Sequence, residues 1–384
     1  MAAERTIALL GGGQLGRMFI ENALRYPVRV TSLDPDPEAP CAHIAHDFKV
    51  GRVTHDATVL EHAALADIVG IEIEHVSIDA LRSLKAQGKR VIPDPDVLAI
   101  IQDKGAQKTF YEEHGIPTAP FALIASPAEI RAHSILLPAF LKARTGGYDG
   151  KGVMPITDTE DISKAFNGPC VLEQRVDIAL ELAVLVVRDD DGRQVVYDPV
   201  EMVFDPRYNL VDHLRAPARI PERTAAQAQG LAERVAKAFN APGLYAVELF
   251  LTKSGDLLVN ETAPRAHNSG HHTIEACASS QFDQLLRLYM GWPLGDASLK
   301  SPAAMINLVG AEGEGEPEMS GVNEILSMPG TFIHLYGKKA TRTGRKMGHV
   351  TVTAPDHQSL DRAITAVKAH CSITPVRSRH SIEP

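Results

Sequence analysis

The residues with the clearest chemical potential are two glutamates, Glu248 and Glu261. They lie in two apolar runs that flank Ser254-Gly255, a pair suited to a two-residue hairpin loop. A hairpin closed there places the glutamates directly opposite one another, about 5 Å apart at their side-chain origins. Like charges so placed are destabilising, and carboxylates suit magnesium, which often bridges them to substrate phosphates. The pair predicts a Mg²⁺ site; two solvated glutamates at a sheet rim are the alternative.

A glycine-rich stretch near the N-terminus, GGGQLG from Gly11 to Gly16, matches the pattern G-x-G-x-x-G. It lies between a predicted strand and a predicted helix, where backbone N–H groups and the positive helix end form an anion site. Asp34, at the end of the next predicted strand, suits the ribose of a dinucleotide. The pattern therefore predicts a nearby phosphate, with a purely structural tight turn as the alternative.

A second glycine-rich stretch, LKARTGGYDGKG from Leu141 to Gly152, follows a predicted strand. It lacks the G-K-[ST] ending of a Walker loop, but a glycine-rich flap can still close over a triphosphate and exclude water. Lys142 places a point charge on a phosphate. A surface hairpin with scattered basic residues is the alternative, and the opposed glutamates favour the phosphate site. The strand CVLEQRV that follows, at 170–176, can offer backbone groups to an adenine edge.

Two histidines directly after the hairpin, His267 and His271, are four residues apart and so raise the possibility of zinc. Pro264 and Gly270 disfavour a helix across this stretch, and no H-E-x-x-H pattern is present. A loop that contacts substrate is the favoured interpretation.

The elements that must position these residues follow from the apolar patterns. Strands at 6–10, 28–33, 67–73 and 90–92 alternate with helices at 16–26, 57–65 and 78–87, which predicts a parallel sheet covered by helices. Asp94 is a candidate cap for one helix that runs from Pro95 to about Glu113. Residues 121–176 read as strand, helix and strand around the second glycine loop. Later strands are predicted at 180–188, 194–204, 305–309, 332–336 and 349–352, with helices at 225–239 and 360–370.

Composition restricts the class of protein. At 384 residues, with 44% hydrophobic and 23% charged residues, the chain is an ordinary globular protein of two or three domains. A net charge of −9 argues against a nucleic-acid partner. The four cysteines lie far apart with no secretory leader, which predicts reduced thiols in a cytoplasmic enzyme. The sequence has no apolar run of the roughly 20 residues that a membrane span needs.

Six motifs together resemble a known family, the ATP-grasp enzymes, and within it the N5-carboxyaminoimidazole ribonucleotide synthetases of purine biosynthesis. The resemblance covers nearly the whole chain. Its motifs are GGGQLGRM at 11–18, IEIEHV at 71–76, RTGGYDGKG at 144–152, EQRV at 173–176, NETAPRAHNSGH at 260–271, and YGK at 336–338 with RKMGH at 345–349.

The resemblance implies an α/β chain, α+β in its ATP-binding part, with the ATP-grasp fold. Its expected parts are an N-terminal Rossmann-like pre-ATP-grasp domain at 1–103, a small lid domain at 104–176, a central domain with the metal hairpin at 177–300, and a small C-terminal domain at 301–384 that packs on the central domain.

The implied reaction joins bicarbonate to 5-aminoimidazole ribonucleotide at the expense of ATP, through carboxyphosphate, and gives N5-carboxyaminoimidazole ribonucleotide, ADP and phosphate. Mg²⁺ is the implied cofactor and a homodimer the implied assembly, without nucleic-acid or membrane partners. Carboxyphosphate hydrolyses readily, so a closed, dry, cation-lined cavity is expected.

The resemblance also implies a role for each matching residue. Metal binding falls to Glu248 and Glu261, with help from Asn260. The implied catalytic residues, around bicarbonate and the aminoimidazole, are Glu74, Tyr148, Asp149, Lys151 and His271. The implied ATP-binding residues are Lys104, Lys142, Gly147, Gly150, Gly152, Glu173, Gln174, Arg175, Val176, Glu181, Asn260 and Glu261. The implied ribonucleotide-binding residues are Gln14, Leu15, Asn268, Lys338 and Arg345.

Three positions depart from the family pattern. Met202 and Phe204 replace the usual Asn and His, which puts a nucleotide contact there in doubt, and Ala183 replaces the usual Ser after the ribose-binding Glu181. We expect activity to survive. The rival functions are a formate-using glycinamide ribonucleotide transformylase of the same superfamily, an NAD-linked dehydrogenase built on the first domain, and a non-catalytic nucleotide sensor.

Overall fold

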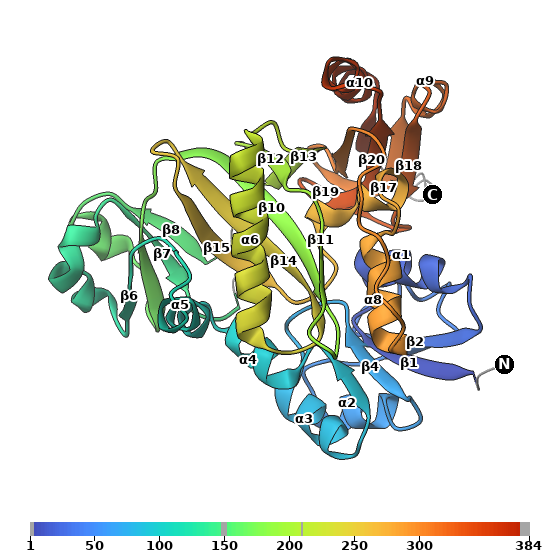
Figure 1. Cartoon of the computed structure of the whole chain (residues 1–384), viewed down its shortest axis with the longest axis horizontal. Helices are drawn as coiled ribbons and strands as arrows, with labels where there is room; N and C mark the ends of the chain where they lie inside the picture. The colour runs from blue at the N-terminus through green and yellow to red at the C-terminus, as the bar shows by residue number, and fades with distance from the viewer. Residues whose placement is uncertain (1–3, 147–151, 209, 377–384) are drawn as a thin grey trace, which may run out of the picture.

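The computed structural model describes residues 4–146, 152–208 and 210–376 (Figure 1). Its N-terminal part is a parallel sheet in the order β3-β2-β1-β4-β5 with helices packed against it. The strands are β1 (Arg5–Leu10), β2 (Val28–Asp34), β3 (Asp47–Val50), β4 (Ile68–Ile71) and β5 (Arg90–Ile92), and the helices are α1 (Gln14–Ala23), α2 (Asp56–His62) and α3 (Ile78–Ala86). The predicted alternation of strands and helices is confirmed, and β3 is an addition that the sequence analysis missed.

The single helix predicted from Pro95 to Glu113 is wrong. The chain forms α4 (Pro95–Gln102) and α5 (Lys104–Glu113), separated by Asp103, whose φ of −114° and ψ of 107° are not helical. The Asp103 side chain accepts hydrogen bonds from the backbone N–H groups of Gly105 and Ala106 and so begins a new helix. Asp94 caps α4 as predicted, because its side chain accepts from the N–H of Asp96.

The next part is an antiparallel sheet in the order β6-β9-β7-β8, which we call the lid sheet. Its strands are β6 (Phe121–Ile124), β7 (Ala139–Ala143), β8 (Val153–Ile156) and β9 (Cys170–Gln174), and its short helices, Pro127–Leu136 and Asp161–Lys164, have the 3₁₀ form. The predicted pattern of strand, helix and strand is confirmed in outline.

A larger sheet forms the centre of the molecule, in the order β15-β14-β10-β12-β13-β16-β20-β18, with β11 paired to β10. Its strands are β10 (Ile178–Arg188), β11 (Gln194–Val196), β12 (Val200–Asp205), β13 (Leu210–Ala216), β14 (Gly243–Thr252), β15 (Leu257–Ala263), β16 (Ala303–Val309), β18 (Thr331–Leu335) and β20 (Lys346–Thr353). The strand predicted over 194–204 is divided in two around Asp198-Pro199, because proline has no N–H for the ladder. Helix α6 (Glu222–Phe239) crosses β10 and β14 (Figure 1).

The last part of the chain adds β16, β20 and β18 to this central sheet. A small sheet, in the order β19-β17-β21, is formed by β17 (Glu314–Ser320), β19 (Thr341–Arg342) and β21 (Ser372–Val376), and the helices here are α9 (Val322–Leu326) and α10 (His357–His370). Because one sheet continues from β13 into β16, the boundary between the third and fourth predicted domains crosses a continuous ladder. The four-part division stays a prediction.

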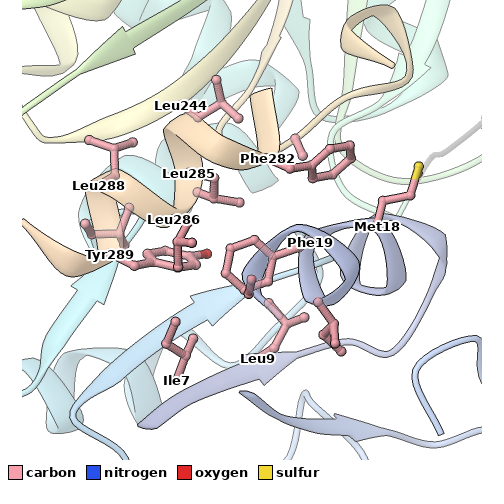
Figure 2. Close-up of a cluster of buried hydrophobic side chains, with 14 of the residues drawn as sticks. Ile7, Leu9, Met18, Phe19, Leu244, Phe282, Leu285, Leu286, Leu288 and Tyr289 are labelled. Atoms are coloured by element: carbon pink, nitrogen blue, oxygen red, sulfur yellow. The ribbon is translucent and has the colours of Figure 1, made fainter. Parts of the chain in front are cut away.

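One hydrophobic cluster joins the N-terminal part to the centre (Figure 2). Leu9 and Phe19 come from β1 and α1, whereas Phe282 and Tyr289 come from α8 (Gln281–Met290). The rings of Phe19 and Tyr289 pack edge to face with centroids 5.4 Å apart. The core therefore holds the first glycine loop against the central sheet. Among the residues that the structure describes, no helix combines the length and apolar character that a membrane crossing requires.

Candidate active site

A cavity of about 530 Å³ lies between the lid sheet and the central sheet. Residues of β7 and β9 line it from the lid sheet, residues of β10, β12, β14 and β15 from the central sheet, and the start of α5 from a third side. The predicted site residues among its lining are Glu74, Lys104, Lys142, Glu173, Gln174, Val176, Glu181, Glu248, Asn260, Glu261 and Asn268. Residues from distant parts of the sequence are thus brought to one cavity.

The hairpin that carries the two glutamates has a longer turn than predicted. Thr252 donates its backbone N–H to Asp256 O at 2.9 Å, so the loop holds the three residues 253–255 and the predicted two-residue loop is wrong. Gly255 has a φ of 93° and donates to Thr252 O at 3.0 Å. A three-residue hairpin loop ends in a left-handed residue, which glycine adopts readily.

A β-bulge in β15, at Asn260 and Glu261 opposite Glu248, restores the predicted neighbours. Val247 pairs with Thr262, but Leu249 pairs with Val259, so Glu248 faces both Asn260 and Glu261. Asn260 Nδ2 donates to Glu248 Oε2 at 3.3 Å. The two glutamates are therefore neighbours, although the bulge rather than the turn brings them together.

The two glutamates differ in their electrostatic surroundings. Burial, together with the negative charges of Glu261 and Glu181, raises the pKa of Glu248. The ammonium group of Lys104, whose Nζ lies 2.7 Å from Glu261 Oε2, holds the pKa of Glu261 below its usual range. The charged form of Glu248 is therefore disfavoured, and a further positive charge nearby would stabilise it.

The donor set fits a divalent cation. Glu248 and Glu261 supply carboxylate oxygens beside Asn260, and a bound cation would offset the repulsion between the two carboxylates. Within the described ranges, no group of three or more His, Cys, Asp or Glu side chains is placed to hold a metal ion. Two protein carboxylates leave positions for phosphate oxygens, which is the usual arrangement for magnesium with a nucleotide.

Two lysines face the same cavity from different elements. Lys104 begins α5, and Lys142 lies on β7 with its Nζ 2.7 Å from Glu173 Oε1 and 3.4 Å from Asn260 Oδ1. The carboxylate of Glu173 is also paired with Lys108, so it lies between two ammonium groups. This positive wall next to the glutamate pair suits a magnesium-bound polyphosphate.

The segment predicted to read adenine forms one edge of the cavity. Gln174 and Val176 line it, whereas Arg175 is exposed. The N–H groups of Gln174 and Arg175 already donate to the carbonyl groups of Pro120 and Pro138. Glu181 lines the cavity on β10, and burial raises its pKa.

Apolar side chains from both sheets form the wall near this segment. Those that line the cavity are Phe140, Ile178, Phe204, Leu210, Val211 and Phe250. Phe204, one of the departures from the family pattern, therefore offers an apolar surface in place of a hydrogen-bonding imidazole. Met202 and Ala183 are instead buried together in a small cluster of the central sheet.

The predicted ribonucleotide residues connect the two ends of the chain. Lys338 Nζ donates to Gln14 Oε1 at 2.7 Å and to Lys346 O at 2.6 Å. Asn268 exchanges two amide hydrogen bonds with Asn307 of β16. Arg345 donates to Ala340 O at 2.8 Å and is not part of the cavity lining.

The first glycine loop is filled by the chain's own carboxylates. Gly12 donates its N–H to Asp34 Oδ2 at 2.7 Å, and Leu15 donates to Glu72 Oε1 at 3.1 Å. A Cβ atom on Gly13 would lie 2.5 Å from Glu72 Oε1. The N–H groups at which a phosphate was predicted therefore already donate to carboxylates of the protein. The Asp34 carboxylate, at which a ribose was predicted, likewise already accepts a hydrogen bond from the loop. The structure favours the tight-turn alternative for the loop itself.

Two of the predicted catalytic residues have contrasting positions. Glu74 lines the cavity and forms an ion pair with Arg265 at 3.0 Å. His271 is completely buried, with its Nδ1 3.1 Å from the side-chain amide of Gln281 and its ring stacked on His349. Burial lowers the pKa of His271 well below its usual range, so the ring is neutral near pH 7.

Five predicted residues lie outside the described residues, namely Gly147, Tyr148, Asp149, Gly150 and Lys151. Gly152, where the description resumes, has a φ of 73° and accepts a hydrogen bond from the N–H of Ala143 at 2.8 Å. This bond continues the pairing of β7 with β8 beyond Lys142.

The structure adds Arg265 and Lys346, to which the sequence analysis gave no role, and it places in the same cavity His267, which the sequence analysis assigned to a loop that contacts substrate. Arg265, His267 and Lys346 line the cavity. His267 Nε2 lies 3.6 Å from Glu248 Oε1, and burial lowers its pKa. The polar run Arg265 to Asn268 after the metal hairpin was a signal for the first two. Lys108 and Lys346 lie far in sequence from Glu173 and His267, on which they act, so only the fold brings them near.

Three family models match successive parts of the chain. They are the ribonucleotide synthetase preATP-grasp domain at 4–102, the ATP-grasp domain at 109–282, and the phosphoribosylaminoimidazole carboxylase C-terminal domain at 303–363. Their order agrees with the order of the sheets along the chain.

Relatives match over nearly the full length. The chain is 37% identical to the N5-carboxyaminoimidazole ribonucleotide synthase of Brucella melitensis, over 91% of this chain and 96% of that one. It is 34% identical to the Bacillus subtilis protein of the same name, over 90% of each. The phosphoribosylaminoimidazole carboxylase of Ogataea methanolica is longer; it is 35% identical, over 99% of this chain and 72% of its own length.

Solved structures match equally well. The N5-carboxyaminoimidazole ribonucleotide synthetase of Thermotoga maritima superimposes with a TM-score of 0.89 at 37% identity, over 97% of this chain and 100% of that one. The Aspergillus clavatus N5-carboxyaminoimidazole synthase, in complex with ADP and 5-aminoimidazole ribonucleotide, gives 0.85 at 34% identity, over 96% and 98%.

Proposed function

The chain belongs to the N5-carboxyaminoimidazole ribonucleotide synthase family of ATP-grasp enzymes, and we propose that it carboxylates 5-aminoimidazole ribonucleotide with ATP and bicarbonate. It is an ATP-dependent ligase of purine biosynthesis. The single observation that carries the proposal is the cavity in which the Glu248/Glu261 pair faces two lysines between the lid sheet and the central sheet.

The first half of the reaction activates bicarbonate. A bicarbonate oxygen attacks the γ-phosphorus of ATP, the bond to the β,γ-bridging oxygen breaks, and ADP and carboxyphosphate result. Lys104 and Lys142 hold the phosphates, and the apolar wall receives the adenine. Mg²⁺ bound by Glu248 and Glu261 would supply positive charge to the phosphate oxygens.

The second half transfers the carboxyl group. Carboxyphosphate releases carbon dioxide and phosphate, and the exocyclic amine of the ribonucleotide attacks that carbon with loss of a proton. Glu74 and Arg265, paired at 3.0 Å, provide a carboxylate and a guanidinium within the same cavity. We assign Glu74 to the amine and keep His271, which is buried and neutral, as a support for the loop behind it.

The ribonucleotide phosphate is assigned to Lys338 and Arg345, where the C-terminal strands approach the first glycine loop. The contact between Lys338 and Gln14 supports this assignment, because it brings both predicted substrate-binding segments together. We also propose a homodimer in the cytoplasm; four free cysteines fit a reducing compartment.

The direct test is phosphate release from Mg-ATP with bicarbonate, measured with and without 5-aminoimidazole ribonucleotide. We expect strong dependence on the ribonucleotide, and we expect Glu261→Gln to reduce kcat by at least about a hundredfold because it removes a metal-binding charge.

Two other outcomes of this assay would support a different function. Turnover only with glycinamide ribonucleotide and formate would assign the chain to the transformylase reaction. ATP binding without turnover of either substrate would leave a nucleotide sensor. Exposed Glu129→Gln serves as a control that keeps the full rate.

A further inference from the structure

A buried pair of charges stands directly behind the cavity wall. Lys108 Nζ lies 2.5 Å from Glu173 Oε2, and Lys142 Nζ lies 2.7 Å from Glu173 Oε1. The side chains of Lys108 and Glu173 are only 5% and 3% exposed. Lys142 and Glu173 line the cavity, but Lys108 does not.

The charge balance of this group is unequal. Within this group of three side chains, two ammonium groups share one carboxylate, which leaves one net positive charge that the more distant Glu261 offsets only in part. Such an arrangement is costly in a low-dielectric interior unless another anion completes it. Lys142 faces the cavity, where the carboxylates of Glu261 and Glu181 also act on it, so a further anion that interacts with this group would bind in the cavity.

Lys108 is held in place by more than the carboxylate. Its Nζ donates to Thr118 Oγ1 at 2.5 Å, and that hydroxyl donates in turn to Val259 O at 2.7 Å. Lys108 also lies one helical turn after Lys104 on α5, on the face of the helix that meets the cavity. It therefore has a fixed distance from both phosphate-facing lysines.

We propose that Lys108 is a positioning residue for nucleotide phosphates, which neutralises Glu173 from behind so that Glu173 does not cancel the positive charge that Lys142 presents to the cavity. The inference rests on the proposed use of ATP and names a residue outside the predicted site. Without Lys108, Glu173 and Lys142 would neutralise each other, and phosphate binding would weaken while the apolar adenine wall stayed intact.

The ionisation of the group agrees with this arrangement. Although burial opposes it, the charges of Lys108 and Lys142 hold the pKa of Glu173 below its usual range. Burial lowers the pKa of Lys108, and the carboxylate of Glu173 opposes that shift. Loss of Glu173 therefore favours a neutral Lys108.

The test compares the binding of Mg-ATP and adenosine by calorimetry, without ribonucleotide or bicarbonate. Lys108→Met keeps the length and apolar stem of the side chain. We expect it to weaken Mg-ATP binding roughly tenfold and adenosine binding less than about twofold, because only the phosphates sense the lost charge. Exposed Lys164→Met, which also removes a lysine from an ion pair, is the matched control and leaves both affinities unchanged.

A second variant separates charge from structure. In a Glu173→Gln background, Lys108→Met is expected to change Mg-ATP affinity less than about threefold, because Lys108 no longer has a carboxylate to neutralise. The proposal would be overturned if Lys108→Met weakened the binding of Mg-ATP and of adenosine equally. It would also be overturned if Lys108→Met caused the same tenfold loss of Mg-ATP affinity in the wild-type and in the Glu173→Gln protein.

Folding is followed by thermal melting of each variant. If Lys108→Met does not fold, Lys108→Gln takes its place: it also removes the charge, so the proposal expects the same selective loss of Mg-ATP affinity, and equal losses of affinity for Mg-ATP and adenosine contradict it. Failure of the wild-type protein to bind Mg-ATP would instead contradict the proposed function.

Discussion

The behaviour of single residues in the site is governed by shared charge. Glu248 and Glu261 lie side by side, but Lys104 pairs directly with Glu261 and stabilises its charge most, whereas burial and two neighbouring carboxylates outweigh the effect of Lys104 on Glu248. The two glutamates therefore have different protonation states in the ligand-free protein, although the sequence presents them as equivalent.

Binding of Mg-ATP should release a proton from Glu248. The raised pKa keeps this carboxyl protonated near neutral pH, and coordination of a cation requires the charged form. Affinity should therefore increase as the pH rises from about 6 to 8. Calorimetry in two buffers with different ionisation enthalpies measures the protons released; we expect a fraction up to about one per site. Glu248→Gln should release none, and a wild-type value of zero contradicts the assignment.

The same residue should make the ligand-free protein less stable at higher pH. The folded protein keeps a proton on Glu248 that the unfolded chain releases above the ordinary pKa of 4.5, so the free energy of unfolding falls as the pH rises through that window. We expect Glu248→Gln to raise Tm by a few degrees at pH 8 and by little at pH 5. A shift of equal size at both pH values would indicate a packing effect instead.

At the scale of elements, helix termini and a strand bulge set the positions of the charged groups. Asp103 ends one helix register and starts another, which directs Lys104 into the cavity. The bulge in β15, opposite Glu248, likewise places Glu261 beside Glu248. Each is a local irregularity in an otherwise regular element, placed where a functional side chain needs a particular direction.

Asp103→Ala should impair both stability and nucleotide binding. The variant loses the cap of α5 and the ion pair in which Arg144 Nη2 lies 2.6 Å from Asp103 Oδ2. We expect a loss of about 1–2 kcal/mol in the free energy of unfolding and a several-fold rise in the KM for ATP, measured by urea unfolding and steady-state kinetics.

The matched control is Asp94→Ala. Asp94 also caps a helix, α4, but the residue that follows it does not line the cavity, whereas Lys104 after Asp103 does. Asp94→Ala should lower the free energy of unfolding by a similar amount and leave the KM for ATP unchanged. A rise in KM for both variants would show that general loosening of the helices, rather than the direction of Lys104, is responsible.

At the scale of the whole molecule, one core connects the two ends of the site. The cluster around Phe19 and Tyr289 fixes α1 to α8, and so places Gln14 near Lys338 across more than three hundred residues of sequence (Figure 2). The ribonucleotide side of the site therefore depends on packing far from any substrate.

Phe19→Ala should destabilise the N-terminal and central parts together. Phe19 is 1% exposed and packs against residues of both parts, so we expect a loss of about 3–5 kcal/mol and a single shifted transition in urea unfolding. Val59→Ala, in the separate cluster of the N-terminal sheet, is the comparison. Two separated transitions in the wild-type protein would show that the parts unfold independently.

The sequence by itself determined most of the regular elements and many residues of the cavity. Strand and helix periods, the cap at Asp94 and the βαβ alternation are local properties, so they could be predicted from neighbouring residues. The hairpin and the second glycine-rich stretch likewise gave Glu248, Glu261 and Lys142, whereas Lys104 followed only from the resemblance to the family.

Only the tertiary structure decided how these residues pair. The bulge opposite Glu248, the break at Asp103, the filling of the glycine loop by Glu72 and the pairing of Lys108 with Glu173 all depend on partners far apart in the chain. Spacing along the sequence carries no information about such contacts, because burial and opposite charge act through space, and the packed core fixes which charges become neighbours.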